Sequence, residues 1–354
     1  MRIAFVIPDV TRGYGTERTT VLLANTFVAL GHEVSILSIF KEEPQVRFPV
    51  DERVKICYLI QERYTHKNSL LSIARQYVRA VMALRGYFRK HAQDVIIGQT
   101  FLSNFFLWIS GKSTCTFACE HYEYGAYPFL IRAFRNWMYR KFRLLVVLTE
   151  KDARKFISRH VRCAVIPNMI SFPIAEESAC GKKRMISVGR LHAQKGYDLL
   201  LYALKPVFEK YSDWAMDIYG EGGDRPMLEG LRDELGLAGN VNFRGFSTNI
   251  QYEYAHASFY VMSSRFEGFP MVLLEAMACG LPIVSFDCPN GPADLLAGDA
   301  GLLVEAGNIK ALSEAIIRMI ENPDKREMYA KNGLCKIRQY TAGEIYKRWE
   351  ALFH

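Results

Sequence analysis

Two glutamates in the second half of the chain flank the predicted start of a helix and could bind one ligand. The run SSRFEGFPMVLLEAMACGLP places Glu267 in a loop and Glu275 inside the helix that follows. Pro270 suits the first turn of that helix, and the unpaired N–H groups near Met271 and Val272 would form an anion site. Because a carboxylate repels phosphate, each glutamate is better suited to sugar hydroxyls. A loop charge and a solvated helix residue are the alternative, which the surrounding glycine, proline and apolar helix weaken.

Two cations follow another predicted strand. In VGRLHAQKG, Arg190 comes directly after the strand and Lys195 lies five residues further on. Two cations at a strand end can neutralise a diphosphate without a metal ion. This segment alone also fits two ordinary surface cations.

Two segments of the first half carry weaker signals. The run GYGTER around Gly15 resembles the GxGxxG fingerprint, but Arg18 stands where a third glycine is needed, which argues against a dinucleotide cofactor. Gly15 could still let the backbone approach a phosphate. His121 follows a predicted strand, and its position leaves a functional and a structural role open.

Alternating strands and helices must position these residues. Residues 3–8 form a continuous apolar run, typical of a strand covered on both faces. A helical pattern follows and stops at Gly31. Further strands are expected at 33–40, 54–60, 94–99, 113–119 and 144–149. Strands that alternate with helices predict a parallel sheet and a Rossmann-like domain over residues 1–170.

The alternation restarts after residues 166–183, where two prolines and a glycine predict a hinge. Strands are expected at 185–191, 214–220, 240–246, 257–264, 282–287 and 301–307. The predicted fold class is therefore α/β, with two Rossmann-like doubly wound parallel-sheet domains, 1–170 and 171–340, facing a cleft. Ligands should bind at the carboxyl ends of the strands. We expect a last helix, about 341–354, to pack back on the first domain.

Composition excludes several classes of protein. The chain has 354 residues, of which 50% are hydrophobic and 23% charged, as in globular rather than disordered proteins. No apolar run reaches the roughly 18 residues that span a bilayer, and the start is too short for a secretory leader. We therefore expect a cytoplasmic protein. The eight cysteines lack metal-site spacing, so we expect reduced, buried thiols and no metal.

Positive charge is concentrated in the first half. Residues 1–170 hold 25 Lys and Arg against 13 Asp and Glu, whereas the remainder holds 20 against 24. At 100° per residue, helix 72–90 has its cations on one face. Helix 130–143 should have its arginines on the face opposite Leu130, Phe134 and Trp137. An ordinary solvated face is the alternative. The charge favours an anionic membrane surface or a lipid-diphosphate acceptor, and no nucleic-acid motif is present. The predicted contact residues are Arg75, Arg79, Arg85, Arg89, Arg132 and Arg135.

The E-x7-E pair, the run EGFPMVLLEAMACGLPIV and the segment VGRLHAQKG resemble the retaining glycosyltransferases of family 4, which have the two-domain GT-B fold. The resemblance covers essentially the whole chain, is specific over residues 185–296, and extends to bacterial hexosyltransferases that build lipopolysaccharide, O-antigen or other surface glycans. It implies transfer of a hexose or N-acetylhexosamine from a UDP-sugar to a hydroxyl of a lipid-linked or surface-glycan acceptor. The UDP-sugar is a co-substrate, no cofactor is expected, and the protein would be peripheral on the inner face of the cell membrane.

The resemblance also implies a role for each site residue. Residues matching Arg190 and Lys195 hold the donor diphosphate, and the one matching Glu275 binds the ribose. Glu267 and the amides after it would hold the donor sugar, with His121 near the reacting sugar. The expected catalytic residues are Glu267, His121, Arg190 and Lys195. The expected donor-binding residues are Gly15, Arg190, Lys195, Arg244, Phe246, Glu267, Gly268, Phe269, Met271, Val272 and Glu275.

The sequence departs from the family pattern at two places. Tyr14-Gly15 replaces paired glycines in the first loop, and the segment 290–294 replaces Gly-Gly-x-x-Glu, which leaves the donor sugar open. No Asp-x-Asp motif follows a strand, in agreement with metal-independent chemistry. Two other functions remain: a nucleotide-sugar-binding GT-B protein without transferase activity, and a GT-B-like sugar-nucleotide epimerase. The epimerase would need acid and base residues that the sequence does not match.

Overall fold

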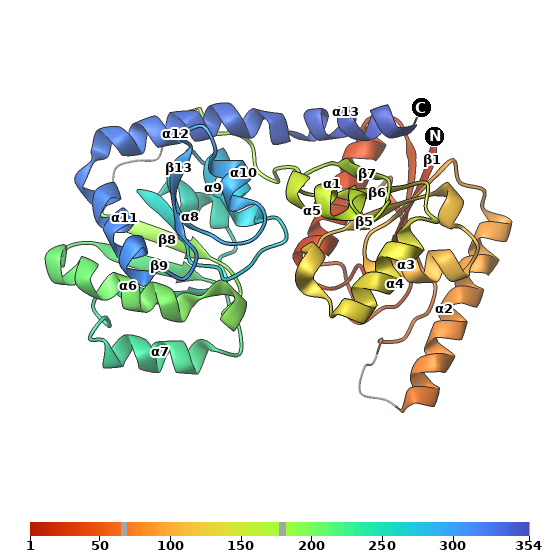
Figure 1. The fold of residues 1–354 in the computed structure, drawn as a ribbon, viewed down its shortest axis with the longest axis horizontal. Helices are drawn as coiled ribbons and strands as arrows, with labels where there is room; N and C mark the ends of the chain where they lie inside the picture. Colours follow the sequence, from red (N-terminus) through yellow and green to blue (C-terminus); the bar gives the residue numbers. More distant parts are fainter. Residues whose placement is uncertain (65–68, 177–181, 354) are drawn as a thin grey trace. The chain divides into compact units, whose positions relative to one another are not determined.

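A computed structural model describes residues 1–64, 69–176 and 182–353. The chain forms two compact units (Figure 1): unit 1 is Met1–Met169 with Ala342–His354, and unit 2 is Ile170–Thr341. Each unit is built on one parallel sheet. Part of the predicted hinge at 166–183, including Cys180, lies outside the described residues. None of the described helices is long and apolar enough to cross a membrane.

Unit 1 contains a seven-stranded sheet of order β3-β2-β1-β4-β5-β6-β7. The first predicted strand is β1, whose residues after Arg2 are all buried, as its continuous apolar run predicts. The strand predicted from residue 113 begins only at Thr116, because Ser113–Cys115 form a 3₁₀ turn. The strands are β1 (Arg2–Ile7), β2 (Glu33–Ser38), β3 (Lys55–Tyr58), β4 (Val95–Gly98), β5 (Thr116–Glu120), β6 (Leu144–Val147) and β7 (Cys163–Val165).

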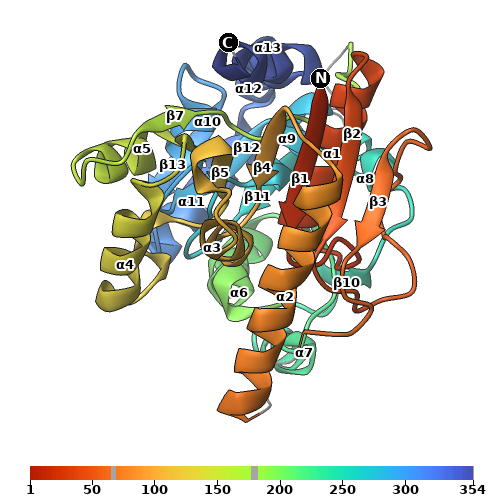
Figure 2. The same ribbon diagram turned by 90° about the vertical axis from the view of Figure 1, so that its right-hand side faces the viewer.

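Helices cover both faces of this sheet. One face packs against α1 (Gly15–Ala29) and α13 (Ala342–Phe353), with Phe27 and Trp349 in the interface. The other packs against α2 (Leu70–Lys90), α3 (Phe101–Ile109), α4 (Phe129–Tyr139) and α5 (Glu150–Ile157). Figures 1 and 2 show α2, α3 and α4 as neighbours on that face. The last helix thus belongs to the core of unit 1.

Unit 2 contains a six-stranded parallel sheet of order β10-β9-β8-β11-β12-β13. Its strands are β8 (Arg184–Val188), β9 (Ala215–Tyr219), β10 (Val241–Gly245), β11 (Phe259–Met262), β12 (Ile283–Asp287) and β13 (Gly301–Glu305). Its helices are α6 (Tyr197–Lys210), α7 (Arg225–Glu234), α8 (Ile250–Ala255), α9 (Met271–Ala278), α10 (Pro292–Leu296), α11 (Ile309–Glu321) and α12 (Pro323–Ile337). The predicted fold class, two Rossmann-like parallel-sheet α/β domains, is confirmed.

The orientation of α4 corrects the sequence prediction. Arg135 is completely buried, whereas Leu130 is 79% and Trp137 45% exposed. The guanidinium of Arg135 donates to Glu120 Oε2 at 3.2 Å and to the carbonyl of Tyr124 at 2.8 Å. Arg135 therefore cannot contact a membrane, and the prediction for this residue is wrong. The physical reason is that the buried carboxylate at the end of β5 requires a cationic partner, which helical periodicity alone does not reveal.

Replacing Arg135 tests this buried ion pair. Burial raises the pKa of Glu120, and the charge of Arg135 opposes that rise. We expect Arg135→Ala to lower the free energy of unfolding by roughly 3–5 kcal/mol, because it leaves a buried carboxylate without its cationic partner. The exposed Arg89 is the control, since Arg89→Ala should stay within about 0.5 kcal/mol of wild type. The measurement is urea unfolding of the full chain, and equal small losses for both variants would contradict the burial of Arg135.

Candidate functional site

The carboxyl edge of the unit 2 sheet brings Lys195 and Glu267 together. Lys195 ends the short turn after β8, and Glu267 lies in the loop after β11. Lys195 Nζ donates to Glu267 Oε1 at 2.7 Å, and Ser264 Oγ donates to the same oxygen at 2.7 Å. Glu267 is buried and Lys195 half-buried. The two predicted catalytic residues thus form one ion pair, although 72 residues separate them.

Gly196 allows these two loops to approach each other. Its φ of +62° lies in the left-handed region, and a Cβ atom here would stand 2.1 Å from the carbonyl oxygen of Ser263. The loops are joined by hydrogen bonds from Ser263 Oγ to Lys195 O at 3.0 Å and from Gln194 Nε2 to Phe266 O at 3.0 Å. Only glycine fits at position 196 without moving the loop that carries Lys195.

Helix α9 begins directly after this ion pair. Pro270 is its N-cap residue, so the first helical residues are Met271 and Val272, both half-buried. Gly291, at φ +103°, lies against Pro270, where a Cβ atom would stand 2.4 Å from the proline Cδ. The free N–H groups at the start of α9 make this end of the helix suited to an anion. Between Glu267 and α9, Gly268 is half-buried and Phe269 is buried.

Glu275 lies one turn deeper in α9 and is 2% exposed. Its Oε2 accepts from Tyr254 OH at 3.2 Å, and its Oε1 accepts from Ser171 Oγ at 3.4 Å. Burial raises the pKa of Tyr260, and the charges of Glu267 and Glu275 raise it further. The predicted contact of Glu275 with a ribose stays a prediction.

Three other residues predicted to bind the donor lie on this unit. Arg190 is exposed and lies directly after Gly189, the glycine that follows β8. Arg244 lies in β10, where its Nε donates to Asp217 Oδ1 at 2.8 Å. Phe246 follows β10 and is 78% exposed. An aromatic ring this exposed beside an arginine is available to a planar group, and donor binding by both residues stays a prediction.

The sequence prediction missed a charged cluster beside Arg244. Arg184 forms an ion pair with the buried Asp217, and its Nη2 donates to Glu253 Oε2 at 2.8 Å. Tyr219 donates to the same oxygen of Glu253 at 2.6 Å. These residues line an open pocket with Arg244 and Phe246. They come from separate strands and a helix, so no sequence spacing could have indicated them.

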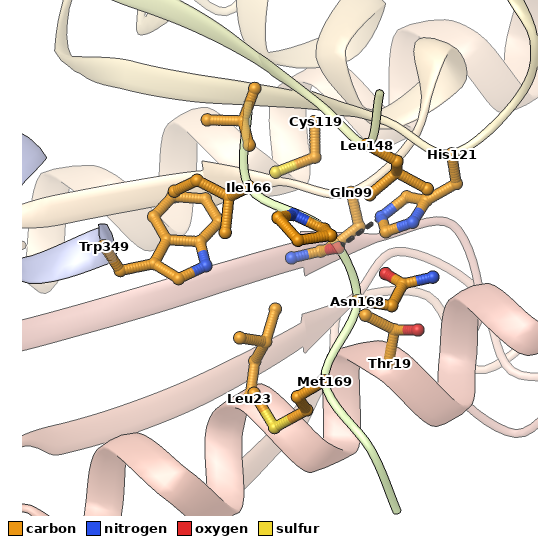
Figure 3. A pocket seen from close by; sticks show the side chains of 12 residues that line it. Thr19, Leu23, Gln99, Cys119, His121, Leu148, Ile166, Asn168, Met169 and Trp349 are labelled. Atoms are coloured by element: carbon orange, nitrogen blue, oxygen red, sulfur yellow. Dashed lines mark hydrogen bonds between the residues drawn. The ribbon is translucent and has the colours of Figure 1, made fainter. Parts of the chain in front are cut away.

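In unit 1, His121 bonds to Gln99 at the carboxyl ends of β5 and β4. Figure 3 shows both side chains beside a small cavity. The cavity has a volume of about 10 Å³, and His121 Nε2 lies 2.9 Å from Gln99 Oε1. Burial lowers the pKa of His121 to about 4, so the imidazole is neutral at pH 7. Since an amide oxygen only accepts, Nε2 carries the hydrogen and Nδ1 is left as an acceptor. A role for Gln99 is not predicted from the sequence. The sequence signal for it is weak, namely a polar residue at the end of an apolar run.

Gly15 begins α1 at the same edge of the unit 1 sheet. It is exposed, and a Cβ atom here would meet nothing within 4 Å. The helix start is fixed by Glu17, whose Oε2 accepts from the N–H of Tyr14 at 3.2 Å. The space beside Gly15 is open to a ligand, and the predicted phosphate contact stays a prediction.

The cations of α2 lie on its exposed face. Arg75, Arg79, Arg85 and Arg89 are all exposed. Arg79 makes a two-point ion pair with Glu62, at 2.8 and 3.0 Å, and Arg85 donates to the carbonyl of Ile109 at 2.8 Å. On α4, Arg132 is half-buried over the ring of Tyr124. Of the six predicted membrane contacts, Arg135 alone is buried.

The described residues include no group of three His, Cys, Asp or Glu side chains that could hold a metal ion. Seven described cysteines are free. Among them, Cys115 in the 3₁₀ turn before β5 and Cys335 on helix α12 are exposed rather than buried.

Both halves of the chain match known families. Residues 14–172 match the family described as Glycosyltransferase Family 4, and residues 172–334 match Glycosyl transferases group 1. The two matches meet at residue 172, close to the boundary between the two units.

Three curated relatives and one solved structure illustrate the similarity. An uncharacterized glycosyltransferase of Haemophilus influenzae is 27% identical over 99% of both chains. The amylovoran biosynthesis glycosyltransferase AmsD of Erwinia amylovora is 24% identical over 100% of this chain and 99% of its own. A Campylobacter jejuni N-acetylgalactosaminyltransferase that acts on a diphospho-undecaprenol glycan is 30% identical over 52% of this chain and 51% of its own. The fold is that of S. aureus TarM, crystallised with UDP, at a TM-score of 0.81, 15% identity and coverage of 100% and 99%.

The His121–Gln99 contact can be measured directly. We expect ¹⁵N NMR to show a neutral His121 with hydrogen on Nε2 down to about pH 5, because its pKa is about 4, whereas ordinary histidine titrates near pH 6.5. Gln99→Glu should raise this pKa, since a carboxylate favours the charged imidazolium. Gln99→Met should leave the pKa low and mix the two tautomers. His121→Gln identifies the resonance, and hydrogen on Nδ1 in the wild type would contradict the geometry.

Proposed function

The chain is a two-domain glycosyltransferase of the GT-B fold, and on this premise we propose that it uses a UDP-sugar. It transfers a hexose or N-acetylhexosamine, with retention of configuration and without a metal ion, to a hydroxyl of a lipid-linked or surface-glycan acceptor. The observation that carries the proposal is the cluster of Lys195, Glu267 and the start of α9 at the carboxyl edge of unit 2.

This cluster has the chemistry that a sugar diphosphate requires. An ammonium group has three N–H donors, so Lys195 can hold Glu267 and still donate to a phosphate oxygen. Arg190 and the free amides of α9 supply further positive potential, which stabilises the charge that develops on the departing diphosphate. Glu267 accepts hydrogen bonds only, which suits the hydroxyls of the donor sugar. In this way cations and amides replace the metal ion that other transferases use.

Relatives and charge support the choice of substrates. TarM was crystallised with UDP, and the C. jejuni relative is named for an undecaprenol-linked acceptor. The surplus of Lys and Arg in residues 1–170 fits an acceptor held at an anionic membrane. We place the protein in the cytoplasm, peripheral on the inner face of the cell membrane.

A nucleotide panel tests the proposed donor. UDP should raise the melting temperature of the full chain more than GDP or ADP, because a ligand that binds only the folded state stabilises it. Incubation with the UDP-sugars that stabilise the protein and a lipid-linked glycan should then give a product whose anomeric configuration matches that of the donor. Absence of stabilisation by any uridine nucleotide would refute the proposal.

Removing either cation should slow transfer. We expect Arg190→Ala and Lys195→Ala each to lower kcat by ~10²-fold or more, since each removes a charge-assisted contact to the leaving group. Lys205→Ala is the control, because this exposed lysine of α6 lies outside the cluster. Steady-state rates within about threefold of wild type for both site variants, with a folded protein confirmed by thermal unfolding, would contradict these roles.

Chelation tests the proposed metal independence. Exhaustive EDTA treatment should leave the transfer rate unchanged, because Lys195, Arg190 and the α9 amides supply the charge that a cation would otherwise provide. The assay is transfer of labelled sugar before and after chelation. Loss of activity that Mg²⁺ or Mn²⁺ restores would show that a metal takes part.

A further inference from the structure

Unit 1 exposes large apolar side chains on three neighbouring helices. Leu130 is 79%, Phe129 71% and Leu71 75% exposed. We call this region the α2–α4 surface. Its exposed apolar members are Leu71, Val78 and Met82 of α2, Ile109 of α3, and Phe129, Leu130, Ile131 and Trp137 of α4. Large exposed apolar side chains gathered on adjacent helices are typical of an interaction site.

Ring contacts hold the three helices against one another. Phe105 of α3 contacts Tyr77 of α2 and Phe134 of α4, at ring-centre distances of 6.0 and 6.1 Å. Trp108 of α3 contacts Trp137 of α4 at 5.3 Å. These rings pack against the core of unit 1. The exposed side chains above them therefore project from a rigid support.

Charge indicates what covers this surface. None of the helices α2, α3 and α4 contains an aspartate or glutamate. Residues 70–143 hold eleven Lys and Arg against three Asp and Glu, a surplus equal to the net charge of +8 of the whole chain. A second copy of the chain would bring an equally basic face, so self-association is disfavoured. Exposed apolar side chains among cations, on helices that contain no acidic residue, fit an anionic lipid bilayer.

We propose that the α2–α4 surface docks on an anionic bilayer by inserting Phe129, Leu130 and Trp137 at the level of the lipid headgroups. Arg75 and Arg89, exposed on α2, contact the lipid phosphates. The charge pattern of the sequence predicts electrostatic attachment, whereas the structure adds an apolar insertion that salt does not screen. Arg135 takes no part as a headgroup contact, because its burial turns the apolar side of α4 outward.

Docking would also place His121 relative to the bilayer. Only seven residues separate His121 from Phe129. The segment between them is held by the hydrogen bonds from Arg135 to Tyr124 O at 2.8 Å and from Tyr124 N to Asp152 Oδ1 at 3.1 Å. An inserted α4 thus sets the height of His121 above the lipid, where a lipid-linked acceptor presents its hydroxyl. This consequence rests on the proposed function, whereas the docking itself does not.

Vesicle co-sedimentation of the full chain tests the docking. Wild type should bind phosphatidylcholine vesicles that contain phosphatidylglycerol. The double variant Phe129→Ser, Leu130→Ser should bind at least about tenfold more weakly, because two apolar side chains no longer leave water. The matched control is Ile157→Ser with Met227→Ser, which alters side chains that are 55% and 54% exposed outside the surface. Equal binding by the double variant and its control would refute insertion.

The depth of Trp137 in the bilayer and the salt dependence of vesicle binding distinguish apolar insertion from charge attraction alone. Brominated lipids should quench the fluorescence of the wild type, and Trp137→Phe should remove much of that quenching. High salt should weaken binding without abolishing it, whereas Arg75→Gln with Arg89→Gln should weaken it mainly at low salt. Complete release by salt, or no binding at low salt, would refute the proposal. The proposal would also be refuted if sedimentation velocity showed a wild-type dimer that the Phe129→Ser, Leu130→Ser variant no longer forms.

These outcomes are distinguishable from failure of the proposed function. Vesicle binding is measured without donor or acceptor, so a protein inactive toward UDP-sugars would still dock. Conversely, if the protein does not bind vesicles but transfers sugar to a soluble acceptor, only the docking proposal is refuted.

Discussion

The buried ion pair of Arg135 and Glu120 determines much of unit 1. It joins the end of β5 to the middle of α4, and it also holds the carbonyl of Tyr124 in the loop that follows His121. A buried carboxylate is stable only beside a partner, so α4 must turn Arg135 inward. The apolar residues at the start of α4 are then left outside. One interaction therefore positions the segment after His121 and leaves the apolar side of α4 exposed.

A different constraint organises the site on unit 2. Here a close backbone approach at Gly196 brings the Lys195 loop against the loop of Glu267. The start of α9 follows within a few residues, so a cation, a carboxylate and free amides converge at one sheet edge. Under the proposed function, the cation would hold a phosphate, the carboxylate the sugar hydroxyls, and the amides further anionic charge. The arrangement needs rigid loops more than a deep cavity.

The arginines and lysines of the chain differ in what surrounds them. Arg135 is inside the core, and its charge stabilises the fold. Lys195 is half-buried with one carboxylate partner and donors to spare, the condition of a ligand-binding cation. Arg75 and Arg89 are exposed on a helix without acidic residues, which suits a flexible contact with lipid phosphates. Residue type alone does not distinguish these three environments, because they differ in burial and in the partners of each side chain.

The sequence by itself determined the fold class, because apolar strands that alternate with amphipathic helices leave few arrangements other than parallel sheets. It also indicated Lys195, Glu267 and α9, since loops at the carboxyl ends of parallel strands meet at one edge. Only the tertiary structure decided the partners across the sheet: Gln99 for His121, Asp217 for Arg184, and Glu120 for Arg135. Periodicity assigns side chains to a helix face by polarity, and it fails where a buried carboxylate draws an arginine inward. For that reason the exposed apolar side of α4 could not be read from the chain.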